Sequence, residues 1–114
     1  MIQRDGIYLA SFPFGDKAGM KLRPVLALTG PIGSVPEVLV AYISSVVPDP
    51  LLPFDILLDP AVKEHAATNL KVRSVLRLHK LATIHSSSVV RRLGSLTPDV
   101  RVQVEQKVLQ LLEL

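Results

Sequence analysis

Two short apolar runs constrain the fold of this chain more than any other feature of its sequence. They span residues 25–28 and 38–43, and the Gly- and Pro-containing residues 30–34 mark a turn between them. A strand with one face in water alternates apolar and polar residues, whereas a strand that is covered on both faces reads as a continuous apolar run. The two runs therefore predict strands of either an interior sheet or a small barrel with a partner packed on its outside.

The length of the chain limits how both faces of such strands can be covered. The 114 residues are expected to form one domain, residues 1–114, with a small core. Hydrophobic residues make up 48% of the chain, but it has only two tyrosines, three phenylalanines and no tryptophan, so Val, Leu, Ile and Ala must form that core. A chain of this size cannot easily cover both faces of a sheet by itself, which predicts a homodimer.

The composition excludes several kinds of site. The chain has no cysteine, which excludes disulfides, a thiol nucleophile and thiolate metal ligands and suits a reducing compartment. His65 and His85 have no partner at metal-ligand spacing, so no metal site is expected. The apolar runs are far shorter than the roughly 20 residues of a membrane-spanning helix, and the N-terminus lacks an export signal. We therefore expect a soluble, cytoplasmic protein with no membrane partner. The net charge of +3 and the pI near 9.5 favour a polyanionic partner only weakly.

Other segments predict further elements around the two apolar strands. Residues Gly6–Phe12 are rich in strand formers and are followed by Pro13, which predicts a first strand. Residues 54–58 predict a fourth strand, and residues 60–67 predict a short helical or irregular piece. Residues 86–94 predict a turn or short helix that runs into a last strand.

Residues 72–79 alternate with period two, which predicts a strand with two distinct faces. Arg77 and His79 share one face, and the two leucines beside them share the other. Residues 80–84 either continue this strand or begin another one next to it.

The C-terminal residues predict a packing helix rather than a catalytic one. Thr97 is a capping residue, Pro98 suits the first helical position, and Asp99 complements the helix dipole. Apolar residues then recur at helical spacing and form one stripe: Val100, Val104, Val108, Leu111 and Leu112.

Arg23 is the first candidate for a functional residue. Pro24 holds the backbone of Arg23 in an extended conformation, and a planar guanidinium can donate two parallel hydrogen bonds to a phosphate. The alternative is a solvated arginine at the start of a strand. Ser44 and Ser45 follow the third strand. They either cap a turn or donate to a phosphate, if the fold brings Arg23 alongside.

Several fragments of the sequence, in register with one another, carry a resemblance that covers nearly the whole chain. In this order they resemble the MazF/PemK toxin family: Ile7-Tyr8-Leu9 with Phe12-Pro13-Phe14-Gly15-Asp16, Arg23-Pro24-Val25-Leu26, Ala41-Tyr42-Ile43-Ser44-Ser45, Ser74-Val75-Leu76-Arg77-Leu78-His79-Lys80-Leu81 with Thr83-Ile84, and Val90-Arg91-Arg92-Leu93-Gly94 with Leu96-Thr97-Pro98.

The resemblance implies a mainly β fold: an SH3-like β-barrel of the MazF/PemK/CcdB type with a C-terminal α-helix, working as a homodimer. The implied activity is that of an endoribonuclease, an mRNA interferase that needs neither a metal nor a cofactor. It would cut single-stranded RNA at short preferred sequences and so inhibit translation and growth. The resemblance also implies a cognate antitoxin whose acidic, partly disordered tail occupies the RNA groove.

The resemblance assigns roles to individual residues. Cleavage would use the neighbouring 2′-hydroxyl as nucleophile, so the enzyme must stabilise charge on a five-coordinate phosphorus and move protons. Arg23 matches the arginine of the family's Arg-Pro-Val motif and would hold the scissile phosphate. Ser44 matches a threonine or serine position and would donate a hydrogen bond to that phosphate, with Ser45 beside it. Four further cations either line the RNA path or are solvated surface charges: Lys17, Lys21, Arg91 and Arg92.

Two departures from the family pattern leave alternatives open. Arg77 and His79 fall where some relatives carry an Arg-x-acid pair that contributes to the site. His79 either acts as general base in place of the acid or is an ordinary strand histidine bonded to the backbone. Relatives usually read Arg-Gly-Asp where this chain reads Arg4-Asp5-Gly6, which is expected to change how the first strand begins.

A second class of function therefore stands beside the ribonuclease. The chain could be a non-catalytic barrel of the same family that poisons cells by binding a protein, as gyrase-inhibiting relatives of this fold do. It could also be a degenerate member that retains only antitoxin binding. Arg23 with Ser44 favours the nuclease, whereas His79 in place of an acid leaves the binding protein open.

Overall fold

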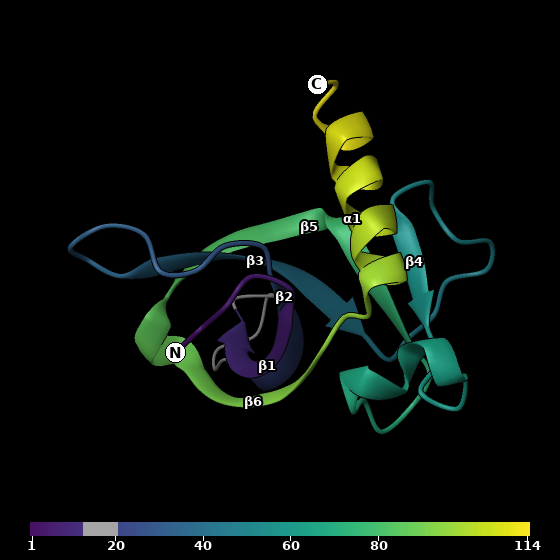
Figure 1. Cartoon of the computed structure of the whole chain (residues 1–114), viewed down its shortest axis with the longest axis horizontal. Helices are drawn as coiled ribbons and strands as arrows, with labels where there is room; N and C mark the ends of the chain where they lie inside the picture. Colours follow the sequence, from purple (N-terminus) through teal and green to yellow (C-terminus); the bar gives the residue numbers. More distant parts are fainter. Residues whose placement is uncertain (13–20) are drawn as a thin grey trace.

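The computed structural model describes residues 1–12 and 21–114. Within these residues, six strands form one antiparallel sheet in the order β4-β5-β3-β2-β1-β6, and a helix follows the last strand (Figure 1). This confirms the predicted mainly β fold with a C-terminal helix. The elements are β1 (Gly6–Phe12), β2 (Lys21–Ala27), β3 (Glu37–Ser44), β4 (Asp55–Leu58), the 3-10 helix η1 (Lys63–Thr68), β5 (Ser74–His85), the 3-10 helix η2 (Ser86–Ser88), β6 (Val89–Ser95) and α1 (Pro98–Leu111).

Irregular pairing curves the sheet. β5 continues through residues 80–84 without a break, and its pairing with β3 shifts where Ala41 opposes Leu81 but Tyr42 opposes Arg77. Extra residues in one strand of a pair bend that strand and increase its twist. The pairing of β1 with β6 shifts as well. In Figure 1, β3 and β5 therefore pass on one side of the β1–β2 pair, and β6 passes on its other side. β4 and β6 remain the two edge strands of the hydrogen-bonded sheet.

Both faces of the central strands are buried within this one chain. Leu26 and Ile43 belong to a core that also contains Val100 and Val104 of α1. Val25, with its neighbours on the same strand face, belongs to a second core on the opposite face of the curled sheet. The idea that a chain of this size needs a partner to cover both faces was therefore wrong, because the curled sheet covers one face and α1 covers the other. The apolar runs alone do not require a homodimer.

The C-terminal helix forms where the sequence predicts it. Thr97 takes the N-cap position and Pro98 the first helical position, and Val100 and Val104 are buried. The predicted side-chain cap is wrong, since the Thr97 hydroxyl is buried and bonds to no described residue. Leu112 lies beyond the end of the helix and is 53% exposed, so the apolar stripe ends before it.

Asp5 connects the start of β1 to α1. Its backbone is left-handed, with φ of 69°, so an aspartate adopts here the conformation of the glycine that relatives are expected to carry. Its side chain is 8% exposed, and one carboxylate oxygen lies 2.9 Å from Nε of Arg101 on the helix. Gly6 must remain glycine, because a Cβ there would overlap the Tyr8 ring. The exchanged Asp-Gly order is thus accommodated by an ion pair to the helix.

We predict that Asp5→Ala lowers the free energy of unfolding by about 1–3 kcal/mol, because alanine tolerates left-handed backbone poorly and cannot pair with Arg101. Asp5→Asn should cost less, since asparagine tolerates this backbone and can still accept a hydrogen bond. Urea denaturation followed by circular dichroism measures both losses. An alanine variant as stable as the original protein would show that this contact does not hold the helix.

Candidate functional site

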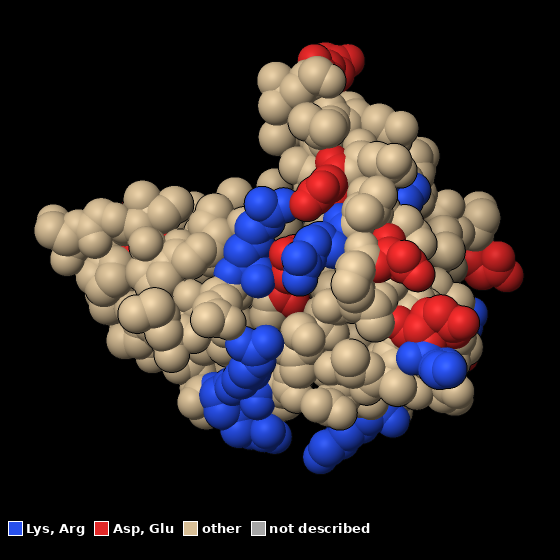
Figure 2. Space-filling model, viewed as in Figure 1, with Lys and Arg blue, Asp and Glu red and all other residues tan. Residues whose placement is uncertain are grey.

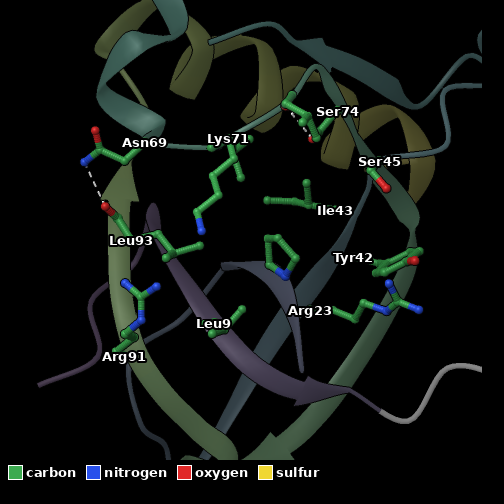
Figure 3. Close-up of a pocket in the computed structure, with 13 residues that line it drawn as sticks. Leu9, Arg23, Tyr42, Ile43, Ser45, Asn69, Lys71, Ser74, Arg91 and Leu93 are labelled. Carbon is green, nitrogen blue, oxygen red and sulfur yellow. Dashed lines mark hydrogen bonds between the residues drawn. The ribbon is translucent and has the colours of Figure 1, made fainter. Parts of the chain in front are cut away.

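A cavity of about 370 Å³ lies between one end of the curled sheet and the segment that follows η1. Strands β1, β2, β3, β5 and β6 contribute to its walls, and residues 69–72 close one side (Figure 3). Its lining is Leu9, Arg23, Pro24, Tyr42, Ile43, Ser45, Asn69, Leu70, Lys71, Val72, Ser74, Arg91 and Leu93.

The cavity opens because β2 parts from β3. Residues 21–24 of β2 pair with β1, but the ladder between β2 and β3 begins only at Val25, opposite Tyr42. Pro24 precedes this point and has no N–H to donate to a neighbouring strand. Arg23 and Pro24 of β2 and Tyr42 and Ile43 of β3 therefore line the cavity where the two strands part.

Three cations line this cavity without a counter-charge. Arg23 comes from β2, Lys71 from the segment after η1, and Arg91 from β6. None of them makes a hydrogen bond or ion pair with another residue in the described part of the chain. The described lining includes no Asp, Glu or His. Like charges around a concave surface attract anions.

Other cations of the chain are engaged in holding the fold. Arg4 lies 2.6 Å from Glu105, Arg101 pairs with Asp5, and Lys107 donates to the carbonyl of Pro53. Figure 2 shows the contrast on one face of the molecule: blue and red side chains mix around α1, whereas the blue groups at the lower edge of the view have no red side chains next to them.

The two serines of the β3 end face different surroundings. Ser45 lines the cavity, whereas Ser44 is 8% exposed and is not part of the lining. The Ser44 hydroxyl accepts a hydrogen bond of 3.1 Å from the amide of Val46, which is the turn-capping alternative named above. Lys21 is exposed at the start of β2, outside the lining, and Lys17 lies outside the described residues.

Arg77 and His79 share one face of β5, as the alternation predicts, and both approach Asp55 of β4. Nε of Arg77 lies 3.0 Å and Nδ1 of His79 lies 3.9 Å from the same carboxylate oxygen. The Asp55 side chain is fully buried and also accepts a hydrogen bond from the amide of Leu52. This cluster is not part of the cavity lining, although Tyr42, which opposes Arg77 across the β3–β5 ladder, does line the cavity.

Sequence reasoning missed Lys71, Asn69 and Asp55. Lys71 lies in an irregular segment with no periodicity to reveal its direction. Asn69 has a left-handed backbone at the end of η1, and an asparagine there is a recognised helix-ending signal. Asp55 would have required the register of β4 against β5, which places it opposite Arg77.

One known protein family matches nearly the whole chain. The sequence model of this family, described as PemK-like, MazF-like toxin of type II toxin-antitoxin system, matches residues 3–112. The chain belongs to this toxin family. A search among curated proteins found no match to this MazF-like toxin.

Solved structures share the fold of this MazF-like toxin over nearly its full length. The Mycobacterium tuberculosis toxin MazF-mt6 has a TM-score of 0.72 at 24% identity, covering 96% of this chain and 97% of that one. A MazE-MazF structure from Deinococcus radiodurans has a TM-score of 0.70 at 19% identity, covering 99% and 97%. An endoribonuclease in complex with its cognate antitoxin, from a mycobacterial species, has a TM-score of 0.69 at 13% identity, covering 100% and 97%. These likenesses establish the shared fold.

The described residues of this toxin contain neither a membrane-spanning helix nor a cluster of metal-binding side chains. No helix among them is both long and apolar enough to span a bilayer. No three His, Asp or Glu side chains in the same part of the chain are grouped so that they could hold a metal ion.

We predict that the paired and unpaired arginines differ sharply in their effect on stability. Arg77→Met should lower the free energy of unfolding by about 3 kcal/mol, because the buried Asp55 carboxylate loses its counter-charge. Arg23→Met should change the same quantity by less than about 0.5 kcal/mol, since Arg23 pairs with no described residue. Urea denaturation compares the two variants. Equal losses would contradict the division between structural and free arginines.

Proposed function

We propose that this MazF-like toxin is an endoribonuclease that cuts single-stranded RNA, mRNA above all, in the cavity around Arg23 and so inhibits translation and growth. One observation carries the proposal: in a chain of this toxin family, Arg23, Lys71 and Arg91 line one cavity with no counter-charge among the described residues. Phosphodiesters supply the missing negative charge. Two structures with the same fold carry the name endoribonuclease, which agrees with this choice.

The proposed chemistry begins with the 2′-hydroxyl of the nucleotide before the cleaved bond. Its oxygen attacks the phosphorus and loses its proton, the bond from phosphorus to the 5′-oxygen breaks, and the 5′-oxygen gains a proton. The products are a 2′,3′-cyclic phosphate and a 5′-hydroxyl. Arg23 stabilises the extra negative charge on the five-coordinate phosphorus, as a preorganised donor does. Because fixed cations supply this charge, we propose that cleavage needs no metal.

We assign the hydrogen bond to the phosphate to Ser45, which lines the cavity, and give Ser44 a positioning role. The bond that Ser44 accepts from Val46 fixes the turn after β3 and so orients Ser45. Arg77 lies on β5, opposite Tyr42 of β3, and its pair with Asp55 ties β5 to β4. His79 is the candidate for the general base. It lies outside the cavity lining, beside Asp55, so the RNA would have to extend from Arg23 toward β4 and β5 to bring its 2′-hydroxyl to His79.

The same cations suit the proposed protein partner. An acidic antitoxin tail would meet Arg23, Lys71 and Arg91 in the cavity and so compete with RNA for it. A neighbour of the same fold is described as being in complex with its cognate antitoxin. We further propose that the toxin acts as a homodimer in the cytoplasm, where mRNA is translated. RNA-sequence preference would then come from residues around the cavity, including the exposed Lys21.

A second candidate function rests on a specific observation. The described cavity lining has no histidine or carboxylate to accept the proton of the 2′-hydroxyl. A non-catalytic member that binds an antitoxin or another protein through the cavity needs no such group. The two candidates differ in whether purified protein breaks an RNA chain.

We predict that purified protein cleaves a long single-stranded RNA in the presence of EDTA, and that Arg23→Ala lowers the rate by about 100-fold or more. Lys63→Ala is the matched control: it removes an exposed cation of η1, outside the cavity, and should cleave at the original rate. Gel analysis of the products measures the rates. Intact RNA with the unmodified protein would favour the binding protein.

We also predict that the two serines separate activity from stability. Ser45→Ala should lower the cleavage rate about tenfold or more while leaving the melting temperature unchanged, since Ser45 is exposed and lines the cavity. Ser44→Ala should lower the free energy of unfolding by about 1 kcal/mol through the lost bond to Val46. Loss of activity in Ser44→Ala at full stability would return the donor role to Ser44.

A further inference from the structure

We propose that Lys71 and Arg91 form a second phosphate subsite, which holds the phosphate next to the scissile one at Arg23. The toxin then engages at least two consecutive phosphodiesters of a single-stranded RNA. This inference rests on the proposed function, because it defines how much of the substrate the same cavity binds. It is carried by the way the fold brings these two cations together.

The first step is the packing of η1 against β6. Gly94 of β6 permits this contact, because a Cβ at that position would overlap the carbonyl oxygens of Ala67 and Thr68. The close approach brings the end of η1 onto the strand that carries Arg91. A larger residue at position 94 would push the two elements apart.

The second step is the turn that follows η1. Asn69 ends this helix with a left-handed backbone, and its side-chain amide donates a 2.8 Å hydrogen bond to the carbonyl of Leu93 on β6. This bond fixes the segment against the strand. Lys71 follows two residues later, and Figure 3 shows its side chain extending into the cavity.

The third step is the register of β6. Arg91 lies two residues before Leu93, so the alternation of a strand puts both side chains on the same face. Both line the cavity, and Arg91 opposes Leu9 of β1, which lines it as well. Lys71 and Arg91 thus reach the cavity from one wall, and neither pairs with another described residue.

Arg23 stands on a different wall, on β2 beside Tyr42 (Figure 3). Between the two groups of charge the lining is largely apolar, and it includes Leu9 and Ile43. A single phosphate ion would meet only one group. An RNA strand repeats its charge at every nucleotide and offers bases that pack on apolar and aromatic side chains in between. This pattern favours RNA over an acidic peptide as the ligand of the pair.

The first experiment measures binding without cleavage. Fluorescence anisotropy follows a labelled single-stranded 2′-O-methyl RNA of mixed sequence, which has no free 2′-hydroxyl to react, at several salt concentrations. Lys71→Met/Arg91→Met should weaken binding and reduce the slope of log K against log salt by about 0.7, since the pair holds one phosphate and each phosphate contact to a single strand contributes about 0.7. Lys63→Met, the matched control, should keep the original slope. An unchanged slope in the double variant overturns the subsite.

The second experiment locates the contacted phosphate. In an oligomer across the mapped cleavage position, the phosphate on one side or the other of the scissile one is replaced by a neutral methylphosphonate. One of these replacements should weaken binding to the original protein about tenfold, but should change binding to the double variant less than twofold, because the contact is already absent. A double variant that still loses tenfold contradicts the assignment.

These outcomes separate the subsite from the nuclease activity. If RNA stays intact but the salt slope falls in the double variant, the subsite holds and the proposed cleavage fails. If the double variant binds RNA as the original protein does but loses binding to an acidic polyglutamate peptide, the pair serves a peptide and the RNA subsite is overturned. Equal melting temperatures of the variants, expected because neither cation pairs with a described residue, confirm that the proteins compared are folded.

Discussion

The early end of the β2–β3 ladder is the constraint on which the candidate site depends. An antiparallel sheet gains stability from every added pair, yet here β3 pairs with β2 only from Val25 onward. The two strands diverge at Pro24, and the space between them becomes the cavity. Arg23 is then held next to this space by its neighbours on β1 rather than covered by β3.

The rest of the molecule compensates for that opening. The shifted β3–β5 pairing and the irregular β1–β6 pairing curve the sheet, and the curl buries one core while α1 buries the other. Arginines that hold these parts together are paired with Asp5, Asp55 or Glu105. Arg23, Lys71 and Arg91, which have no such partner among the described residues, line the cavity. The arginines that hold the fold together and the cations of the cavity thus lie in different parts of the structure.

Strands and the helix could be predicted because their signals are local. The alternation of residues 72–79 gave the shared face of Arg77 and His79, and Pro98 with the apolar spacing after it gave α1. A site residue could be predicted only where a neighbour in the sequence restricts its backbone, as Pro24 does for Arg23. No local signal identifies Lys71, because the direction of its side chain depends on the bond from Asn69 to a strand that lies far along the chain. Ser44 and Ser45 look equivalent in sequence, and only the pleat of β3 separates them.

Because β4 lies at an outer edge of the sheet, we expect it to open locally more readily than the central strands. Four residues pair with β5 on one side alone, and the main charge contact that anchors them is the link from Asp55 to Arg77. Backbone amides of β4 should therefore exchange with solvent deuterium well before those of β2 and β3, which have neighbours on both sides. The sheet would then loosen from its β4 margin inward, and this loosening would reach the cavity at Ser74, which pairs with Leu58 of β4 and lines the cavity.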